Sequence, residues 1–348
     1  MQGSGNDHVI FDVTEQSQVG AVRRHVATAA ANVGFSETSV SNATIVATEL
    51  AANLVRHTPG GEIIVKPVNL PGKQPHLDLW AIDRGPGISD MLRSMQDGYS
   101  TRGGSGTGLG AMKRLACEFD IFSQVDRGTV AFARMKQNLV TSDINDFQWA
   151  CIIRPAPNEE VSGDGFAIEI DADSLACLMV DGLGHGILAA EAAQAAIQGF
   201  LEHTFDDLTN LVATMDRRLR GTRGAAAATV RWNARTGQLN YVGIGNIAGS
   251  IRHFDGGKSR GLVSQNGTLG VQVPKLHPFT YECPLNALVI MHSDGLQSRW
   301  NLDLYPGLVH RHPGVIAGIL YRDFTRGRDD VTVAAIRFNR EPRNGDLA

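Results

Sequence analysis

Four acidic signatures are spread over the second half of the chain, and each lies next to a predicted β-strand. Asp181 and Asp294 each follow an apolar stretch, and Asp329 comes directly before one. Carboxylates this far apart in sequence can share a site only if their strand ends converge, which favours a layered β-fold. Oxygen ligands suit paired Mg²⁺ or Mn²⁺ ions, which activate a water for attack on a phosphate. The four signatures are Asp164, Asp181-Gly182, Asp294-Gly295 and Asp329-Asp330.

The first half carries polar residues of another kind. Glu49 and Asn53 stand four apart on a predicted helix and therefore share one face. The Asn53 amide oxygen suits Mg²⁺, and the Glu49 carboxylate can accept a proton from an attacking hydroxyl or water. Asp83 ends an alternating strand and enters a Gly85-Pro86-Gly87 turn, where the carboxylate can accept the exocyclic amine of adenine and the glycines leave room for the base. These residues predict an ATP site.

A glycine run follows, at Gly104, Gly106, Gly108 and Gly110, before a predicted helix over 109–119. Its amides and the N-terminus of that helix can hold phosphates. The chain contains no G-x-x-x-x-G-K-[ST] sequence, which excludes a P-loop.

In this order and spacing, Asn53, Asp83-Arg-Gly-Pro-Gly87 and Gly106-x-Gly108-x-Gly110 resemble the N, G1 and G2 boxes of the GHKL ATPase/kinase superfamily. The residues 108–119 look like the small RsbT-type anti-sigma-factor serine kinases. The resemblance implies Glu49 as the base, Asn53 as the Mg²⁺ ligand and Arg102 as a contact of the γ-phosphate. A nucleotide-dependent binding module without phosphotransfer, or an anti-sigma factor that sequesters a sigma factor, remains an alternative.

The second half resembles the PPM-type Ser/Thr phosphatases of the SpoIIE/RsbU/RsbX branch, and its compact size is most like RsbX. The resemblance implies that Asp181 bridges two Mn²⁺ or Mg²⁺ ions, Gly182 offers its carbonyl, Asp294 and Asp329 complete one metal, and Asp164 supports the other. It is carried by Ser162-Gly-Asp164, Val180-Asp-Gly-Leu-Gly-His-Gly186, Gly243-Ile-Gly-Asn246, Ser293-Asp-Gly295 and Arg328-Asp-Asp-Val-Thr-Val333.

The expected fold is a two-domain α/β (α+β) protein. Residues 1–137 are expected to form a GHKL (Bergerat) α/β sandwich, 138–146 a linker, and 147–340 a PPM-type β-sandwich flanked by α-helices. Patterns of apolar residues predict helices over 16–33, 187–203, 208–219 and 315–324, and a further helix that Ser36 or Thr38 can cap and that ends at about His57. The Ala225–Ala228 run favours a helix by propensity, but its position before Thr229-Val230-Arg231-Trp232 favours a strand.

Composition restricts the partners. Basic and acidic residues balance over 1–137, so the formal net charge of −4 comes from the rest, and neither part has the basic excess of a nucleic-acid-binding protein. Four scattered cysteines are expected to be small buried residues. No signal peptide or membrane-spanning run is apparent, which favours a cytoplasmic protein. The resemblances imply ATP with Mg²⁺ as cofactors and, as substrates, STAS-domain proteins like RsbS and RsbR of a stressosome.

Overall fold

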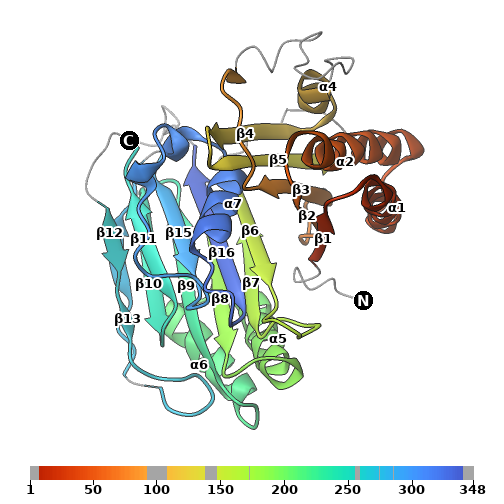
Figure 1. The fold of residues 1–348 in the computed structure, drawn as a ribbon. Helices are drawn as coiled ribbons and strands as arrows, with labels where there is room; N and C mark the ends of the chain where they lie inside the picture. The colour runs from red at the N-terminus through yellow and green to blue at the C-terminus, as the bar shows by residue number, and fades with distance from the viewer. Residues whose placement is uncertain are drawn as a thin grey trace. The chain divides into compact units, whose positions relative to one another are not determined.

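The chain folds into two compact units. The computed structural model describes residues 8–91, 108–137, 147–171, 173–254, 259–273, 275–284 and 286–339. One unit comprises Met1–Ile144 with Gly314–Arg322, and the other comprises Asn145–Pro313 with Asp323–Ala348. Figure 1 labels their helices and strands. The predicted linker 138–146 lies outside the described residues.

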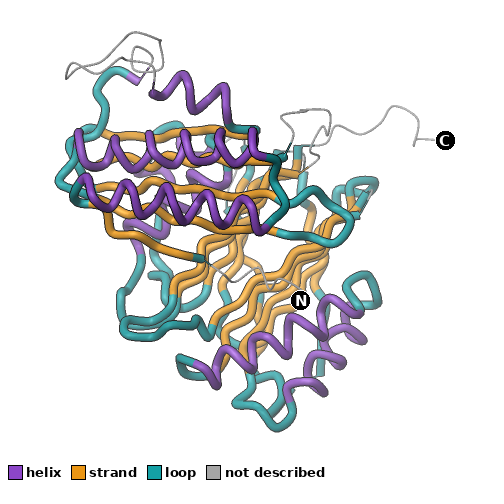
Figure 2. Tube along the Cα trace, turned by 90° about the vertical axis from the view of Figure 1, so that its right-hand side faces the viewer, coloured by secondary structure: helices purple, strands orange, loops and turns teal. Residues whose placement is uncertain are grey.

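The first unit is a five-stranded antiparallel sheet with α1 and α2 on one face. The strand order is β1-β2-β3-β5-β4, and α1 and α2 lie side by side across the sheet, as Figure 2 shows. Their apolar sides and the inner face of the sheet form one core. The bounds are β1 Val9–Val13, α1 Gln16–Asn32, α2 Glu37–His57, β2 Gly61–Val68, β3 His76–Asp83, α4 Gly108–Leu115, β4 Glu118–Gln124 and β5 Gly128–Lys136.

Local sequence explains the bounds of α2. The Ser36 hydroxyl caps its N-terminus by accepting a hydrogen bond from the Ser39 amide at 3.3 Å. Arg56 and His57 occupy the last turn, where cations are favoured. The alanine and leucine residues at helical spacing are buried against the sheet, so the face that carries polar residues is left for other contacts.

The helix predicted over 109–119 is shorter in the structure. It ends at Leu115, and Phe119 lies in β4. The Cys117 amide donates a hydrogen bond to the Arg134 carbonyl at 2.9 Å, and Glu118 pairs with Arg134 across the sheet. Strand pairing with β5 therefore replaces the last helical turn that the sequence pattern favours.

Residues 314–322 of α7 (Pro313–Phe324) belong to the first unit, far from its other elements in sequence. The Trp80 indole donates a hydrogen bond to the Gly314 carbonyl at 2.8 Å. A Cβ at Gly314 would lie 2.5 Å from the Phe132 ring, and one at Gly318 would lie 2.6 Å from Val130. Only glycines allow this close approach of the helix.

A buried ion pair joins β3 and β5. The Arg134 guanidinium donates to both Asp78 oxygens, at 2.7 and 2.8 Å, and Asp78 is fully buried. Burial alone would raise the pKa of Asp78, but the adjacent Arg134 outweighs it and the pKa is lowered. Burial, aided by Arg134, lowers the pKa of the neighbouring His76 to about 3, so His76 is neutral.

We expect Arg134→Met to destabilise the first unit by about 3–5 kcal/mol, because it leaves the Asp78 charge buried without its partner. Amide hydrogen exchange of β3 measures this loss. The double variant Asp78→Leu with Arg134→Met should lose clearly less, and equal losses in the single and double variants would contradict the pairing.

The second unit is a sandwich of two sheets. One sheet has the order β13-β10-β9-β8-β7 with β14 also paired to β10, and the other has the order β12-β11-β15-β16-β6. Trp232 of the first sheet stacks on Phe338 of the second at 4.4 Å between ring centroids and meets Phe147 edge-on, so aromatic rings fill the interior. The bounds are β6 Phe147–Arg154, β7 Asp164–Ile170, β8 Ser174–Gly182, β9 Ala225–Asn233, β10 Gln238–Ile244, β11 Ala248–Arg252, β12 Arg260–Leu262, β13 Ser264–Gln265, β14 Phe279–Glu282, β15 Leu288–His292 and β16 Val331–Phe338.

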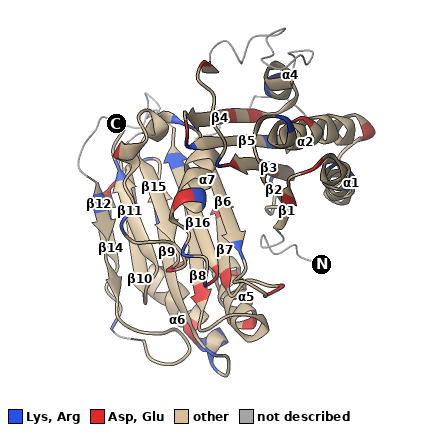
Figure 3. Ribbon diagram, in the orientation of Figure 1, with Lys and Arg blue, Asp and Glu red and all other residues tan. Residues whose placement is uncertain are grey.

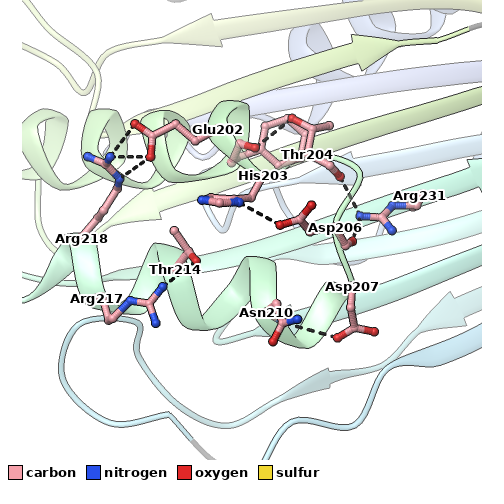
Figure 4. Close-up of polar contacts among 11 residues, drawn as sticks. Glu202, His203, Thr204, Asp206, Asp207, Asn210, Thr214, Arg217, Arg218 and Arg231 are labelled. Atoms are coloured by element: carbon pink, nitrogen blue, oxygen red, sulfur yellow. Dashed lines mark hydrogen bonds and ion pairs between the residues drawn. The ribbon is translucent and has the colours of Figure 1, made fainter.

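Helices α5 (Ile187–Glu202) and α6 (Leu208–Leu219) cover the β7–β10 sheet and share a core with it. Figure 4 shows the polar contacts of their connection. Arg218 of α6 binds the Glu202 carboxylate, and the Arg231 guanidinium of β9 donates to the Thr204 carbonyl at 2.7 Å. Asp207 caps α6 through the Thr209 amide. These contacts fix the helix pair on the sheet.

The other secondary-structure predictions have mixed outcomes. The Ala225–Ala228 run is a strand, within β9. Strands β11 to β14 were not predicted.

Cys151, Cys177 and Cys283 are buried free thiols, as expected, and Cys117 is half-buried. None of the helices in the described ranges is long and apolar enough to cross a membrane.

Candidate functional sites

Helix α2 presents the two polar residues predicted for phosphate chemistry. Glu49 and Asn53 are half-buried, one turn apart. A Cβ at Gly108, the first residue of α4, would lie 3.0 Å from Glu49 Oε2. The Glu49 carboxylate therefore lies beside the start of α4, the part of the unit where the predicted glycine run ends.

Asp83 lies at the end of β3, only 6% exposed. Its Oδ1 accepts a hydrogen bond from the Gly85 amide at 2.7 Å. Burial raises the pKa of Asp83, and backbone hydrogen bonds from Gly85 and Thr129 oppose this rise. The bonds to Asp83 hold its side chain in place at the turn that follows the strand.

The turn after Asp83 requires glycine. Gly87 has a φ of 71°, and a Cβ there would lie 2.1 Å from the Gln124 carbonyl. A Cβ at Gly85 would lie 2.9 Å from Thr58, the residue after α2. The glycines thus let the turn approach β4 and the end of α2, so they have a packing role besides the predicted room for a base.

Only part of the glycine run lies within the described residues. Arg102, Gly104 and Gly106 lie outside the described residues. Gly108 and Gly110 lie within the first turn of α4, so the prediction that the helix begins only after Gly108 was wrong by one residue.

In the second unit, two predicted aspartates face each other across a hairpin. Asp164 is the first residue of β7 and pairs in register with Asp181 near the end of β8. Figure 3 shows acidic residues gathered at this end of the two strands, beside the start of α5. Asp164 is buried and accepts a hydrogen bond from the Ser293 hydroxyl at 2.6 Å. The short hairpin therefore brings two carboxylates together.

Asn246 connects the first sheet to the second at the same place. Its amide nitrogen donates to Asp294 Oδ2 at 2.8 Å and lies 3.4 Å from Asp181 Oδ2. Asp294 follows β15, so carboxylates from both sheets of the sandwich share this amide. The predicted convergence of strand ends is present.

The carboxylates are close enough to raise one another's pKa values. Burial, with the charges of Asp294 and Asp329, raises the pKa of Asp181 to about 7. Burial, with the charge of Asp181, raises the pKa of Asp164 well above its usual value. No Lys or Arg in the described ranges forms an ion pair with Asp164, Asp181, Asp294 or Asp329. The site therefore concentrates negative charge without a cationic side chain to balance it.

Close backbone packing holds the cluster. A Cβ at Gly182 would lie 2.2 Å from the Ala189 carbonyl, and one at Gly295 would lie 1.9 Å from the Asp330 carbonyl. Asp330 itself accepts hydrogen bonds from the Ala156 and Gly163 amides, at 2.7 and 2.9 Å. Asp330 thus holds the backbone of the neighbouring loops, and the charges of both Asp329 and Asp330 help to raise the pKa of Asp181.

The carboxylate oxygens of the cluster are suitable ligands for divalent cations, although the side chains do not yet surround a metal position. Among the residues that the structure describes, no group of three or more His, Cys, Asp or Glu side chains is already placed to hold a metal ion. Clustered carboxylates with raised pKa values and no cationic partner are nevertheless the hard oxygen ligands that Mg²⁺ and Mn²⁺ take.

Two histidines near the cluster have other partners. His185 Nδ1 lies 2.5 Å from Glu159 Oε1. His292 is buried, bonds the Ser293 carbonyl through Nδ1 and accepts from the Trp300 indole through Nε2 at 3.1 Å. Both ring nitrogens of His292 are therefore used within the fold.

Two neighbours of the carboxylates were not predicted as site residues. Asn246 and Ser293 contact the carboxylates directly, and Asp330, part of a predicted acidic signature, holds the loop before β7. The signal for Asn246 was present, because Gly243-Ile-Gly-Asn246 ends a strand in the same way as the acidic signatures.

Comparisons with known proteins assign both halves. A family model described as "Histidine kinase-like ATPase domain" matches residues 13–135, and one described as "Stage II sporulation protein E (SpoIIE)" matches residues 171–339. Serine/threonine-protein kinase RsbT of Bacillus subtilis (strain 168) is 35% identical over 124 residues, which is 36% of this chain and 92% of that protein. Phosphoserine phosphatase RsbX of the same organism is 32% identical over 141 residues, which is 40% of this chain and 69% of that protein.

The chain belongs to both families. An RsbT-like histidine kinase-like ATPase domain precedes an RsbX-like SpoIIE phosphatase domain, as the sequence motifs predicted. A solved structure described as "The bacterial stressosome: a modular system that has been adapted to control secondary messenger signaling" matches with a TM-score of 0.51 and 28% identity, over 55% of this chain and 99% of that chain. The predicted two-domain fold class is confirmed.

Proposed function

We propose that the protein is a bifunctional partner-switching regulator that phosphorylates and dephosphorylates serine or threonine on STAS-domain proteins of the RsbS and RsbR kind. The observation that carries the proposal is the cluster of carboxylates around Asn246, on a chain whose other half is RsbT-like. The opposed reactions would let one protein set the phosphorylation level of its target.

The kinase step uses α2 and the turn after β3. Asp83, held by the Gly85 amide, would accept the adenine amine, and Asn53 would be the protein ligand of Mg²⁺. Glu49 takes the proton of the substrate hydroxyl while the γ-phosphoryl group passes from ATP to that oxygen. Its place beside Gly108 supports this role, because α4 begins where the glycine run would hold the phosphates.

The phosphatase step uses the aspartate cluster. Asp181 with the Gly182 carbonyl, Asp294 and Asp329 would hold two divalent cations, and Asp164 would support one of them. Bound cations supply Lewis-acid stabilisation for the phosphoryl oxygens and make water more acidic. The aspartates would hold the cations beside the ester P–O bond. Water would then replace the serine or threonine oxygen on phosphorus, and a proton from that water would restore the hydroxyl group of the side chain. Ser293 and Asn246 orient Asp164 and Asp294 by donating hydrogen bonds to them.

Metal removal tests the phosphatase step. After EDTA treatment and desalting, hydrolysis of a phosphoserine STAS-domain protein should fall at least about 100-fold and return with Mn²⁺ or Mg²⁺, because carboxylates alone supply no Lewis acid. Phosphate release measures the rate. Full activity of the metal-free protein would contradict the proposal.

A further inference from the structure

A cationic cavity lies in the second unit, apart from the residues assigned to either reaction. It has a volume of about 450 Å³. Its three arginines all carry exposed side chains. The lining residues are Gln297, Ser298, Arg299, Arg326 and Arg328.

Backbone hydrogen bonds hold the two segments that line the cavity against each other. The Arg326 amide donates to the Gly295 carbonyl at 2.9 Å, and the Gln297 amide donates to the Phe324 carbonyl at 2.9 Å. The Trp300 indole, bonded to buried His292, fixes the far end of the first segment. The arginines are therefore presented by a defined backbone and not by an isolated loop.

The arginines of the cavity have no ion-pair partner among the described residues. Neither Arg299, Arg326 nor Arg328 forms an ion pair or a side-chain hydrogen bond with a residue that the structure describes. Three guanidinium groups around one cavity repel one another and favour an anion between them. The cavity thus has the positive charge of an anion-binding site, and no described side chain forms an ion pair with its arginines.

The cavity adjoins the carboxylate cluster through the chain itself. Arg299 comes five residues after Asp294, and Arg328 directly precedes Asp329. A protein segment whose phosphorylated side chain reaches the aspartates would therefore pass close to the arginines with its neighbouring residues. The two sites have opposite charge, so flanking acidic side chains are attracted to the cavity and repelled by the aspartates.

We propose that this arginine cavity binds acidic side chains that flank the phosphorylated serine or threonine of the protein substrate. The inference rests on the proposed phosphatase function, to which it adds a substrate preference. A nucleic acid is the less fitting occupant, because the chain has a net charge of −4 and the acidic residues outnumber the basic ones after residue 137.

A pair of fluorescent phosphoserine peptides tests the preference, one flanked by Asp and Glu and the other by Asn and Gln. The wild-type protein should bind the acidic peptide about 10-fold more tightly by fluorescence anisotropy, and the difference should shrink at high salt. In the double variant Arg299→Gln with Arg326→Gln the two peptides should bind equally. Hydrolysis of p-nitrophenyl phosphate, which has no flanking residues, should stay within about 2-fold of wild type because the arginines act only on those residues.

Arg220→Gln is the matched control, since it removes one exposed positive charge from the end of α6 and should leave the preference intact. Equal binding of both peptides by the wild type, or a preference that survives in the double variant, would overturn the cavity's role. A parallel loss of p-nitrophenyl phosphate hydrolysis would also overturn it. A wild-type protein that prefers the acidic peptide but hydrolyses nothing would support the cavity and contradict the phosphatase function instead.

Discussion

Asp181→Asn is expected to abolish most of the metal-dependent phosphatase activity. Asp181 is the carboxylate on which the cluster converges, with Asp164 opposite it in the sheet and Asn246 between it and Asp294. Loss of an outer partner of a metal site costs about 10–100-fold, so loss of the shared ligand should cost at least about 100-fold. Phosphate release from a phosphoserine STAS-domain protein, with Mn²⁺ present, measures the effect.

The fold should survive this substitution. Asparagine has almost the same size, and it removes a charge that the neighbouring carboxylates repel. The thermal unfolding temperature should therefore not fall. Asp206→Asn is the matched control, because this exposed carboxylate lies in the α5–α6 connection of Figure 4 and should leave turnover unchanged. Normal turnover by Asp181→Asn would show that Asp181 is not the shared ligand.

Glu49→Gln is expected to reduce phosphotransfer by about 10²–10⁴-fold, because glutamine cannot accept the hydroxyl proton. The ATP affinity should stay within about 3-fold, since a general base contributes to the chemical step and not to nucleotide binding. Single-turnover transfer from labelled ATP and isothermal titration with ATP separate the two quantities. This result would favour the kinase over a module that only binds nucleotide.

Two further variants separate a loss of phosphotransfer from a loss of ATP binding. Glu37→Gln removes an exposed carboxylate from the first turn of the same helix and should behave as wild type. Asp83→Asn should instead weaken ATP binding itself, because an amide cannot replace the carboxylate toward the adenine amine. Unchanged transfer in Glu49→Gln would contradict the base assignment, and normal affinity in Asp83→Asn would contradict the adenine contact.

The acidic positions could be predicted because they are local features of the sequence. Asp181 lies at the end of an apolar strand and Asp294 follows one, and such strands end at the rim of a sheet. Asp164 and Asp181 are joined by a hairpin, so their pairing follows from the order of the two strands. Which carboxylates meet across the sandwich depends on how its two sheets pack, and no local pattern contains this information.

Neutral partners of the cluster were harder to predict. Asn246 acts through one amide group placed between Asp181 and Asp294, and Ser293 through one hydroxyl directed at Asp164. Both residue types are common in turns, so only the folded neighbourhood distinguishes a site residue from an ordinary one.

Short elements depend on their surroundings in the same way. Strands β12 and β13 have three and two residues, too few to show an alternating pattern, and exist because longer neighbours pair with them. The early end of α4 is similar, since pairing of Glu118 with Arg134 outweighs the helical pattern of the local sequence.

Transfer of phosphate from ATP to a purified STAS-domain protein by the Asp181→Asn variant shows whether the first domain is a kinase, because this background prevents the second domain from removing the product. We expect phosphoserine or phosphothreonine on the STAS-domain protein, which disappears when wild-type protein and Mn²⁺ are added. Tight binding of ATP without any transfer would contradict the bifunctional account and leave a phosphatase joined to a nucleotide-binding domain.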